Sequence, residues 1–224
     1  MRSYGQYCGL ARALDVIGER WALLIVRELL EGPRGYNELL AGLPGIATNL
    51  LAERLRGLEA QAVAYRTEGG RYALTAWGQG LHEVVYALGR WAGPLMAVPR
   101  GEDHFRPNWL RHMVIARFEG ADPRRRDVTI QLCCEGETMT LVSAGGRVHL
   151  IPGPVAEPDV SLTGPVDAVV GLLLARIGRA GATARGVRSA GDLRKLRGLR
   201  PRGEQPEVVP GSEVPIGGPQ VRGR

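Results

Sequence analysis

The first thirty residues show apolar positions at helical spacing, interrupted by glycine. One stripe, Leu10, Leu14 and Ile17, predicts a first helix. A second helix is predicted from about Glu19 to Leu30, where Gly32-Pro33 ends it.

The next segment has the outline of a helix-turn-helix. A short helix is predicted over Tyr36–Ala41, and residues 42–45 form a turn because proline and two glycines do not continue a helix. A longer helix, Thr48–Ala60, follows, with an apolar face of Leu51, Leu55 and Leu58. Short helix, tight turn and longer amphipathic helix are typical of this motif.

A β-hairpin is predicted after the longer helix. Val63–Thr67 and Arg71–Thr75 flank residues 68–70, whose two glycines accept positive φ, so this hairpin is a wing. Thr75 can cap a further helix from Ala76 to about Trp91. Its apolar positions are Leu81, Val84, Val85, Leu88 and Trp91. They exceed what a small wing domain covers, so a partner subunit is expected to bury them.

The second half of the chain predicts helices and an antiparallel sheet. Residues 93–106 resemble a linker, and a helix is expected over Pro107–Phe118. Alternating segments predict three strands of an antiparallel meander, Val128–Cys134, Thr138–Ser143 and Arg147–Ile151, and then a fourth strand, Val160–Thr163.

A nearly all-apolar helix is predicted after the fourth strand, with Pro165 at its first position and its end near Arg176. Such a helix must be buried, either against a sheet or against a ligand. A last amphipathic helix is expected over Ala190–Leu199. Residues 201–224 are rich in proline and glycine and predict a disordered tail.

These elements predict an α+β protein of 224 residues in two domains. Residues 1–92 form a mainly helical winged helix-turn-helix for DNA binding and dimerisation, 93–106 a linker, 107–200 an α+β domain and 201–224 the tail. No apolar segment is long enough for a signal or a membrane span, so a cytoplasmic protein is expected.

Charge agrees with a nucleic-acid partner but does not identify one. The net charge is +6, whereas residues 1–100 hold 11 basic and 9 acidic side chains, a net charge of only +2. The basic set comprises 28 arginines and one lysine, which either suits phosphate binding or reflects GC-rich codons. The spacing of histidines, cysteines and carboxylates predicts no metal site, cofactor or catalytic residue, so an enzyme is not expected.

In a helix-turn-helix the outer face of the second helix contacts bases. If the three leucines face inward, this face holds Thr48, Asn49, Ala52, Glu53 and Arg56. Asparagine suits adenine, and arginine suits guanine or phosphate. Arg66 and Arg71 of the wing suit phosphate or minor-groove contacts, and Tyr36 is a further candidate at the interface. A surface helix without function would also present a polar face.

Six segments carry a family resemblance. They are residues 7–21 (YCGLARALDVIGERW), 27–30 (RELL), 36–39 (YNEL), 43–46 (LPGI), 51–59 (LAERLRGLE) and 74–78 (LTAWG). Together they resemble the HxlR family of winged-helix regulators over about residues 7–92. The resemblance implies a homodimer with the first and post-wing helices at the dimer contact. The predicted dimer interface then comprises Leu10 of the first helix and Leu81, Val85, Leu88 and Trp91 of the post-wing helix. Many members carry a basic residue where this chain has Asn49, so the family's base preferences are not transferred.

Cys8 matches a cysteine that some members of this family use to sense oxidants or electrophiles. A thiolate at a helix N-terminus has a lowered pKa and reacts faster. The alternative is a structural or idle thiol. Cys133 and Cys134 point to opposite faces of a strand, so one of them is expected to fill the core.

The C-terminal half, about residues 107–200, is similar to sterol-carrier-protein-2-like domains in its order of helix, meander, strand and apolar helix. The similarity implies an apolar tunnel, with Val169, Leu172, Leu173 and Ile177 facing an apolar or amphipathic small molecule. A closed core would need the same residues.

Two functions remain open from the sequence. The first is a homodimeric transcription regulator that binds double-stranded DNA, modulated by a small molecule or by oxidation of Cys8. The second is a carrier or sequestering protein for apolar ligands whose winged-helix domain only dimerises.

Overall fold

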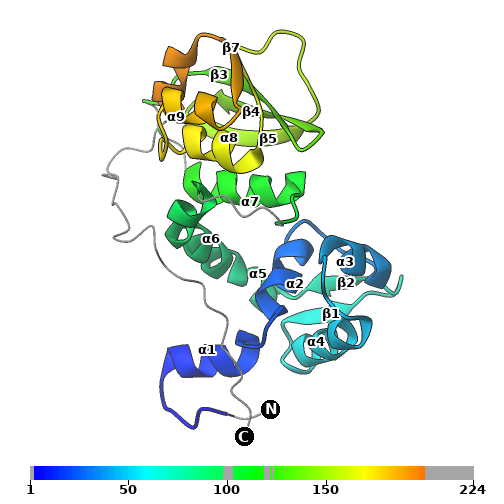
Figure 1. Cartoon of the computed structure of the whole chain (residues 1–224). Coiled ribbons are helices and arrows are strands. Elements are labelled where there is room, and N and C mark those ends of the chain that lie inside the picture. The colour runs from blue at the N-terminus through cyan, green and yellow to red at the C-terminus, as the bar shows by residue number, and fades with distance from the viewer. Residues whose placement is uncertain (1–2, 98–102, 119–121, 123, 200–224) are drawn as a thin grey trace, which may run out of the picture. The chain divides into compact units, whose positions relative to one another are not determined.

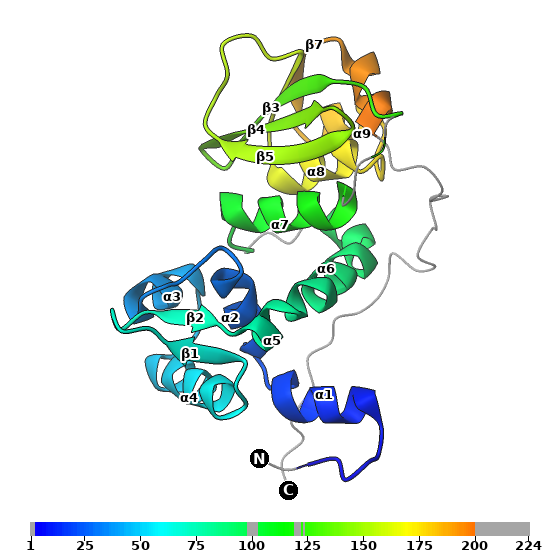
Figure 2. The same cartoon turned by 180° about the vertical axis from the view of Figure 1, so that it is seen from behind.

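The structure of the chain, a computed structural model, describes residues 3–97, 103–118, 122 and 124–199 and divides into two units (Figures 1 and 2). The units are Met1–Trp91 and Ala92–Arg224. The predicted tail at 201–224 and residues 98–102 of the predicted linker lie outside the described residues. Within the described part, no helix combines the length and apolar character needed to cross a membrane.

The first unit is mainly helical. Its elements are α1 (Gly9–Ile17), α2 (Ala22–Leu29), α3 (Tyr36–Gly42), α4 (Thr48–Ala60), β1 (Ala64–Arg66), β2 (Tyr72–Leu74), α5 (Ala76–Gln79) and α6 (Leu81–Trp91). The leucine face of α4 packs into one core with Ile25, Leu29, Leu39 and Leu43. The prediction of α4 is confirmed, whereas α2 begins three residues later than predicted. Trp21, at φ 80°, is left-handed and cannot belong to the helix.

The strands of the wing are shorter than predicted, and a third segment, at Arg34, pairs with β2. β1 and β2 pair antiparallel, with Tyr65 opposite Ala73, and Gly70 takes φ 73° in the turn. Arg34 also pairs with Tyr72, its amide donating to the Tyr72 carbonyl at 2.9 Å and its carbonyl accepting the return bond at 2.8 Å. This bridge joins the hairpin to the segment that precedes α3.

Thr75 and Gly78 build the junction between the wing and the helices that follow. The Thr75 hydroxyl accepts the Gly78 amide at 3.0 Å and donates to the Ala62 carbonyl at 2.7 Å, so the predicted cap is present. The single helix predicted over 76–91 is wrong, because it breaks at Gly80 into α5 and α6. The Gly80 amide bonds to the Trp77 carbonyl, three residues back, which tightens the chain there.

The second unit is a five-stranded sheet with helices. Its elements are η1 (Gly93–Ala97), α7 (Pro107–Phe118), β3 (Val128–Cys134), β4 (Glu137–Ala144), β5 (Arg147–Pro152), β6 (Val160–Thr163), α8 (Val166–Leu173), α9 (Arg179–Ala184), β7 (Arg188–Gly191) and η2 (Leu193–Leu199). The strand order is β5-β4-β3-β6-β7. The β3–β5 meander is antiparallel, but β3 and β6 are parallel, so the sheet is mixed and not antiparallel as predicted.

Helices α7 and α8 lie on the same side of this sheet (Figures 1 and 2). Alternate residues of β3 are buried, and Ile130 and Leu132 pack with Val169 of α8 in a core of their own. Cys134 belongs to this core and Cys133 is half-buried, which confirms that one cysteine fills the interior.

Three predicted segments of the second unit are wrong. Residues 93–97 of the predicted linker form η1, which packs against α8, and α8 ends at Leu173 instead of near Arg176. The helix predicted over Ala190–Leu199 is the end of β7 followed by η2. Its apolar residues Leu193, Leu196 and Leu199 recur every third position, which is the period of a 3₁₀ helix.

Gly78 leads to a prediction about stability. A Cβ atom there would lie 2.0 Å from the Val63 carbonyl oxygen, and neither backbone can move away cheaply. We expect Gly78→Ala to lower the free energy of unfolding by about 1–3 kcal/mol, as overpacking does. Urea denaturation of the full chain measures the change.

Gly57→Ala is the matched control. Gly57 lies inside α4, and nothing lies within 4 Å of the point that a Cβ atom would occupy, so alanine there should stabilise the chain by about 0.5–1 kcal/mol. Equal effects of the two substitutions would contradict the assigned role of Gly78.

Candidate functional site

Helix α4 presents a polar face to solvent. Thr48, Asn49, Glu53 and Arg56 are exposed and Ala52 is half-buried, while the leucines of the opposite face are buried. The Asn49 side-chain oxygen accepts the Leu50 amide at 2.9 Å, and its NH₂ group is left to donate. Arg56 has no hydrogen bond or ion pair to any described residue. The predicted base-contacting residues therefore lie together on one accessible face.

Two side chains hold α4 in place. The Tyr36 hydroxyl donates to the Thr48 carbonyl at 2.6 Å, which ties the start of α3 to the start of α4. Arg54 donates to the Arg20 carbonyl at 3.1 Å and pairs with Glu19 at 2.9 Å. Sequence reasoning took Tyr36 as an interface residue and missed Arg54, because nothing in the pattern distinguishes a clamping arginine from a solvated one.

The two wing arginines differ in their surroundings. Arg66 is exposed, its Nε bonding to the Gly70 carbonyl at 3.3 Å and its guanidinium lying 5.9 Å from the centre of the Tyr72 ring. Arg71 donates to the Pro33 carbonyl at 2.8 Å through Nη2 and pairs with Glu38 at 2.7 Å. Arg71 Nε also donates to the Pro33 carbonyl, at 3.2 Å, so Arg71 links the wing to the segment before α3 and to α3 itself, and Nη1 makes no bond to a described residue.

Glu38 is the acidic end of this link. Its carboxylate accepts the amide of Gly35, at the start of α3, as well as the Arg71 guanidinium. The Gly35 amide is the larger cause, and the Arg71 bond the second, of a pKa held below the usual range for a glutamate. Sequence reasoning missed Glu38, although its position three residues after Gly35 is where a capping glutamate is expected.

The residues predicted for a dimer contact divide into two groups. Leu81 and Val85 pack in part against the core of the first unit. Leu88 and Trp91 of α6 are 46% and 77% exposed, and Leu10 of α1 is 69% exposed. Helix α6 buries none of its residues, so its own unit covers only one edge of its apolar face.

Cys8 is exposed at the N-cap position of α1. The backbone amide of Ala11, and then that of Leu10, lower the pKa of the Cys8 thiol because they stabilise the thiolate. Burial instead raises the pKa of Cys134 to about 12. The two thiols therefore differ in both access and acidity.

Comparison with known proteins identifies the first unit. Residues 16–98 match the family described as HxlR-like helix-turn-helix. The HTH-type transcriptional regulator Rv3095 of Mycobacterium tuberculosis is 36% identical over 121 residues, 51% of this chain and 72% of that protein. The chain belongs to the HxlR-like family.

A second relative of this HxlR-like chain is YvaP of Bacillus subtilis, also an HTH-type transcriptional regulator. It is 33% identical over 87 residues, 36% of this chain and 81% of that one. The family match and these two relatives make the chain a transcriptional regulator of helix-turn-helix type.

Solved structures of similar proteins include quinone-bound YodB from B. subtilis. It is 34% identical, covers 37% of this chain and 93% of that chain, and has a TM-score of 0.35. The redox regulator HypR in its oxidised form is 29% identical, covers 38% and 94%, and has a TM-score of 0.33.

The second unit of the HxlR-like chain contains a pocket, but the predicted ligand residues do not line it. Val169 and Leu173 are buried in the core, and Leu172 and Ile177 pack against that core. The pocket is bordered by other positions of α8, Val166 and Val170 among them. Within the described residues, no three His, Cys, Asp or Glu side chains are grouped to hold a metal ion.

The contrast between Cys8 and Cys134 gives a testable prediction. Iodoacetamide reacts with thiolates, so in the native chain at pH 7 it should modify Cys8 first and leave Cys134 unmodified. The lowered pKa of Cys8 places the midpoint of its rate profile at a lower pH in the native than in the denatured chain. Peptide mass spectrometry of the full chain measures the three rates.

Denatured protein is the control, since all three cysteines should then react alike. Native Cys8 that reacts no faster at pH 7 than denatured Cys8 would rule out activation by the α1 N-terminus.

Proposed function

We propose that the chain binds duplex DNA as a homodimer, with α4 in the major groove and the β1–β2 wing against the backbone. The observation that carries this proposal is the Arg56 side chain, which is exposed on the polar face of α4 without a partner among the described residues. An arginine in this position is available for a bidentate contact to guanine or phosphate. The HxlR-like match over residues 16–98 supports the same use of this helix.

In this proposal, residues of α4 contact the bases and a residue of the wing contacts the phosphates. The Asn49 amide is suited to adenine, and Arg56 to guanine, with Thr48, Ala52 and Glu53 at their side on α4. Arg66 provides the accessible cation of the wing for phosphate. Arg71 contributes mainly by holding the wing on α3 through Pro33 and Glu38, so its loss should displace Arg66 as well.

The DNA interface predicts distinct effects for two arginines. Genomic fragments that the full-length protein enriches provide the specific DNA, and fluorescence anisotropy measures affinity at several salt concentrations. Arg56→Ala should weaken specific binding by about 1–3 kcal/mol and leave non-specific binding less affected. Arg66→Ala should weaken binding to all DNA sequences alike. It should also reduce the steepness with which affinity falls as the salt concentration rises.

Arg147→Ala is the matched control, because it removes the same charge from an exposed position of β5 in the second unit. If Arg56→Ala and Arg147→Ala leave binding equally unchanged, α4 is not the reader helix.

The homodimer is proposed to bury the exposed apolar residues of α6 and those of α1. Leu10 of α1 and Leu88 and Trp91 of α6 are exposed, and Leu81 and Val85 of α6 are partly buried against the core. Each large apolar side chain taken from water contributes about 1.5–3 kcal/mol, so a few of them per protomer favour association.

Analytical ultracentrifugation of the full chain tests the dimer at micromolar concentration. Leu88→Lys should shift the population to monomer, because it would place a charge in the apolar contact. Ile151→Lys changes a similarly exposed apolar residue of β5 and should leave the dimer intact. A wild-type monomer would contradict the proposed assembly.

We also propose that oxidation of Cys8 modulates DNA binding. The exposed thiol with a lowered pKa supports this, and Cys8 matches the cysteine that some members of the family use as a sensor. Treatment with diamide should then change the DNA affinity of the wild type and not that of Cys8→Ser. Equal responses of the two would remove Cys8 from the regulation.

The second unit is proposed to modulate DNA binding by taking up an apolar or amphipathic small molecule, as its predicted likeness to sterol-carrier-protein-2-like domains implies. A ligand can act only if it binds the two states of the regulator with different affinity. By linkage, DNA must then change the affinity for the ligand by the same factor.

A further inference from the structure

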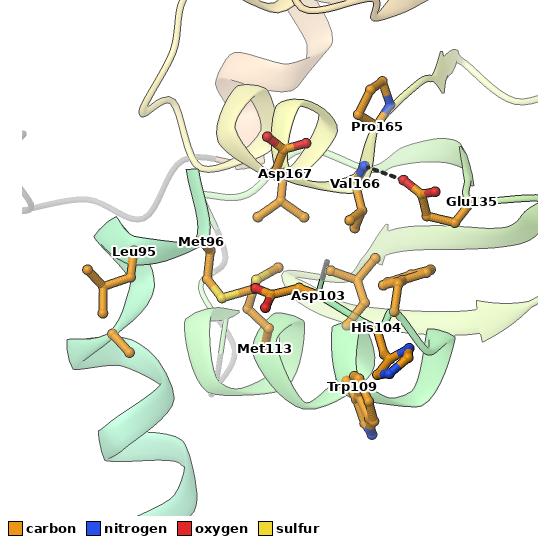
Figure 3. Close-up of a pocket in the computed structure, with 14 residues that line it drawn as sticks. Leu95, Met96, Asp103, His104, Trp109, Met113, Glu135, Pro165, Val166 and Asp167 are labelled. Carbon is orange, nitrogen blue, oxygen red and sulfur yellow. Dashed lines mark hydrogen bonds between the residues drawn. The ribbon is translucent and has the colours of Figure 1, made fainter. Parts of the chain in front are cut away.

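A pocket of about 490 Å³ lies within the second unit, between η1, the residues before α7, α7 itself and the start of α8 (Figure 3). Its size falls in the range of small-molecule sites, roughly 300–1,000 Å³. Most of its wall is apolar: Ala92, Leu95, Met96, Phe105, Trp109, Leu110, Met113, Pro165, Val166 and Val170. The volume and the wall suit a molecule with a sizeable apolar body.

Two methionines and a tryptophan characterise the wall. Met96 of η1 and Met113 of α7 have flexible, polarisable side chains that adapt to ligands of different outline. Trp109 of α7 also borders the pocket. These residues favour a broad apolar fit over a single fixed shape.

The polar part of the wall is acidic. It consists of Asp103, His104, Glu135 and Asp167, and neither lysine nor arginine lines the pocket among the described residues. Asp167 is neutralised by an ion pair with Arg185, and Figure 3 shows its carboxylate pointing away from the cavity. Asp103 has no hydrogen bond or ion pair to a described residue. Two carboxylates, those of Asp103 and Glu135, are thus left without a counter-charge among these residues.

The start of α8 would ordinarily attract an anion, since its first amides are free to donate. Here the Glu135 carboxylate accepts the Val166 amide at 3.4 Å, as the dashed line in Figure 3 marks. An anionic head group at this position would have to displace this carboxylate. The position is therefore occupied by negative charge of the protein itself.

We propose that this pocket binds an amphipathic organic cation: an apolar, aromatic or aliphatic body fills the space between η1, α7 and α8, and a positively charged nitrogen or phosphorus centre lies near Asp103 and Glu135. The inference rests on the proposed modulation by a small molecule, which it deepens by naming the site and the ligand class. It places the ligand on the Val166–Val170 face of α8, not on the Val169–Leu173 face that the sequence predicted.

Tetraphenylphosphonium and tetraphenylborate provide a matched pair of probes, because they have nearly the same shape and opposite charge. Isothermal titration of the full chain, without DNA, should show saturable binding of the cation with one site per chain. The cation should bind at least about tenfold more tightly than the anion. Equal affinities, a preference for the anion, or no saturable binding of the cation would overturn the proposal.

Substitutions locate the site. Asp103→Asn with Glu135→Gln should weaken binding of the cation about tenfold and leave the anion unaffected or bound more tightly. Glu157→Gln, which neutralises an exposed carboxylate outside the pocket, should change neither. Ala92→Trp should fill the cavity and abolish binding of the cation, whereas binding that survives both this change and the double variant would place the site elsewhere.

Trp109 supplies a second readout of the same event. Binding should change the tryptophan fluorescence of the wild type, and Trp109→Phe should remove most of that change although Trp21, Trp77 and Trp91 remain. A signal that persists in Trp109→Phe would assign the event to another part of the chain. Because no step involves DNA, these results stand apart from any failure of the DNA-binding proposal.

Discussion

The burial of one leucine face sets the rotation of α4 about its axis, and the candidate interface depends on that rotation. Leu51, Leu55 and Leu58 are at most 2% exposed and pack into the core formed with α2 and α3. Turning the helix would return large apolar side chains to water, at about 1.5–3 kcal/mol each. The polar positions of α4 are thereby directed outward as a consequence of core packing, before any contact with DNA.

Hydrogen bonds then fix what packing leaves free. Apolar contacts tolerate sliding along a helix axis, whereas the bond from Tyr36 to the Thr48 carbonyl and the clamp of Arg54 on Glu19 and Arg20 do not. Arg71 and Glu38 do the same for the wing. Some arginines of the first unit therefore fix its internal geometry, whereas others, Arg56 among them, are exposed at the surface.

The sequence predicts helices from their hydrophobic period, but it does not predict contacts between residues that are distant along the chain. The bounds of α4 follow from a 3.6-residue period with a polar flank, and they are confirmed. The α-helix predicted over Ala190–Leu199 is wrong, because Leu193, Leu196 and Leu199 recur every third residue and short windows separate this period poorly from 3.6. Arg54, Arg56 and Arg71 look alike in a sequence, and their separate roles depend on partners distant along the chain. The sequence also could not show which residues of α8 border the pocket. Helix α8 is apolar on nearly every side, so no polar stripe in its sequence shows which side meets the sheet. Val169, Val170 and Leu173 all belong to the core, and of these only Val170 also borders the pocket, together with Val166.

The modest charge of the first unit has a consequence for the proposed dimer. Residues 1–100 carry a net charge of only +2, and Arg54 and Arg71 are engaged within the unit. Non-specific affinity for DNA grows with the number of phosphates neutralised, so one such unit would bind DNA weakly at physiological salt. Two units joined along α6 would double the phosphate contacts and add a second reader helix. In the proposed dimer, association would be the step that raises the DNA affinity of a weakly charged domain. Chemistry at Cys8, at the N-cap of α1, would then act on DNA binding by changing the proposed contacts of α1 and α6.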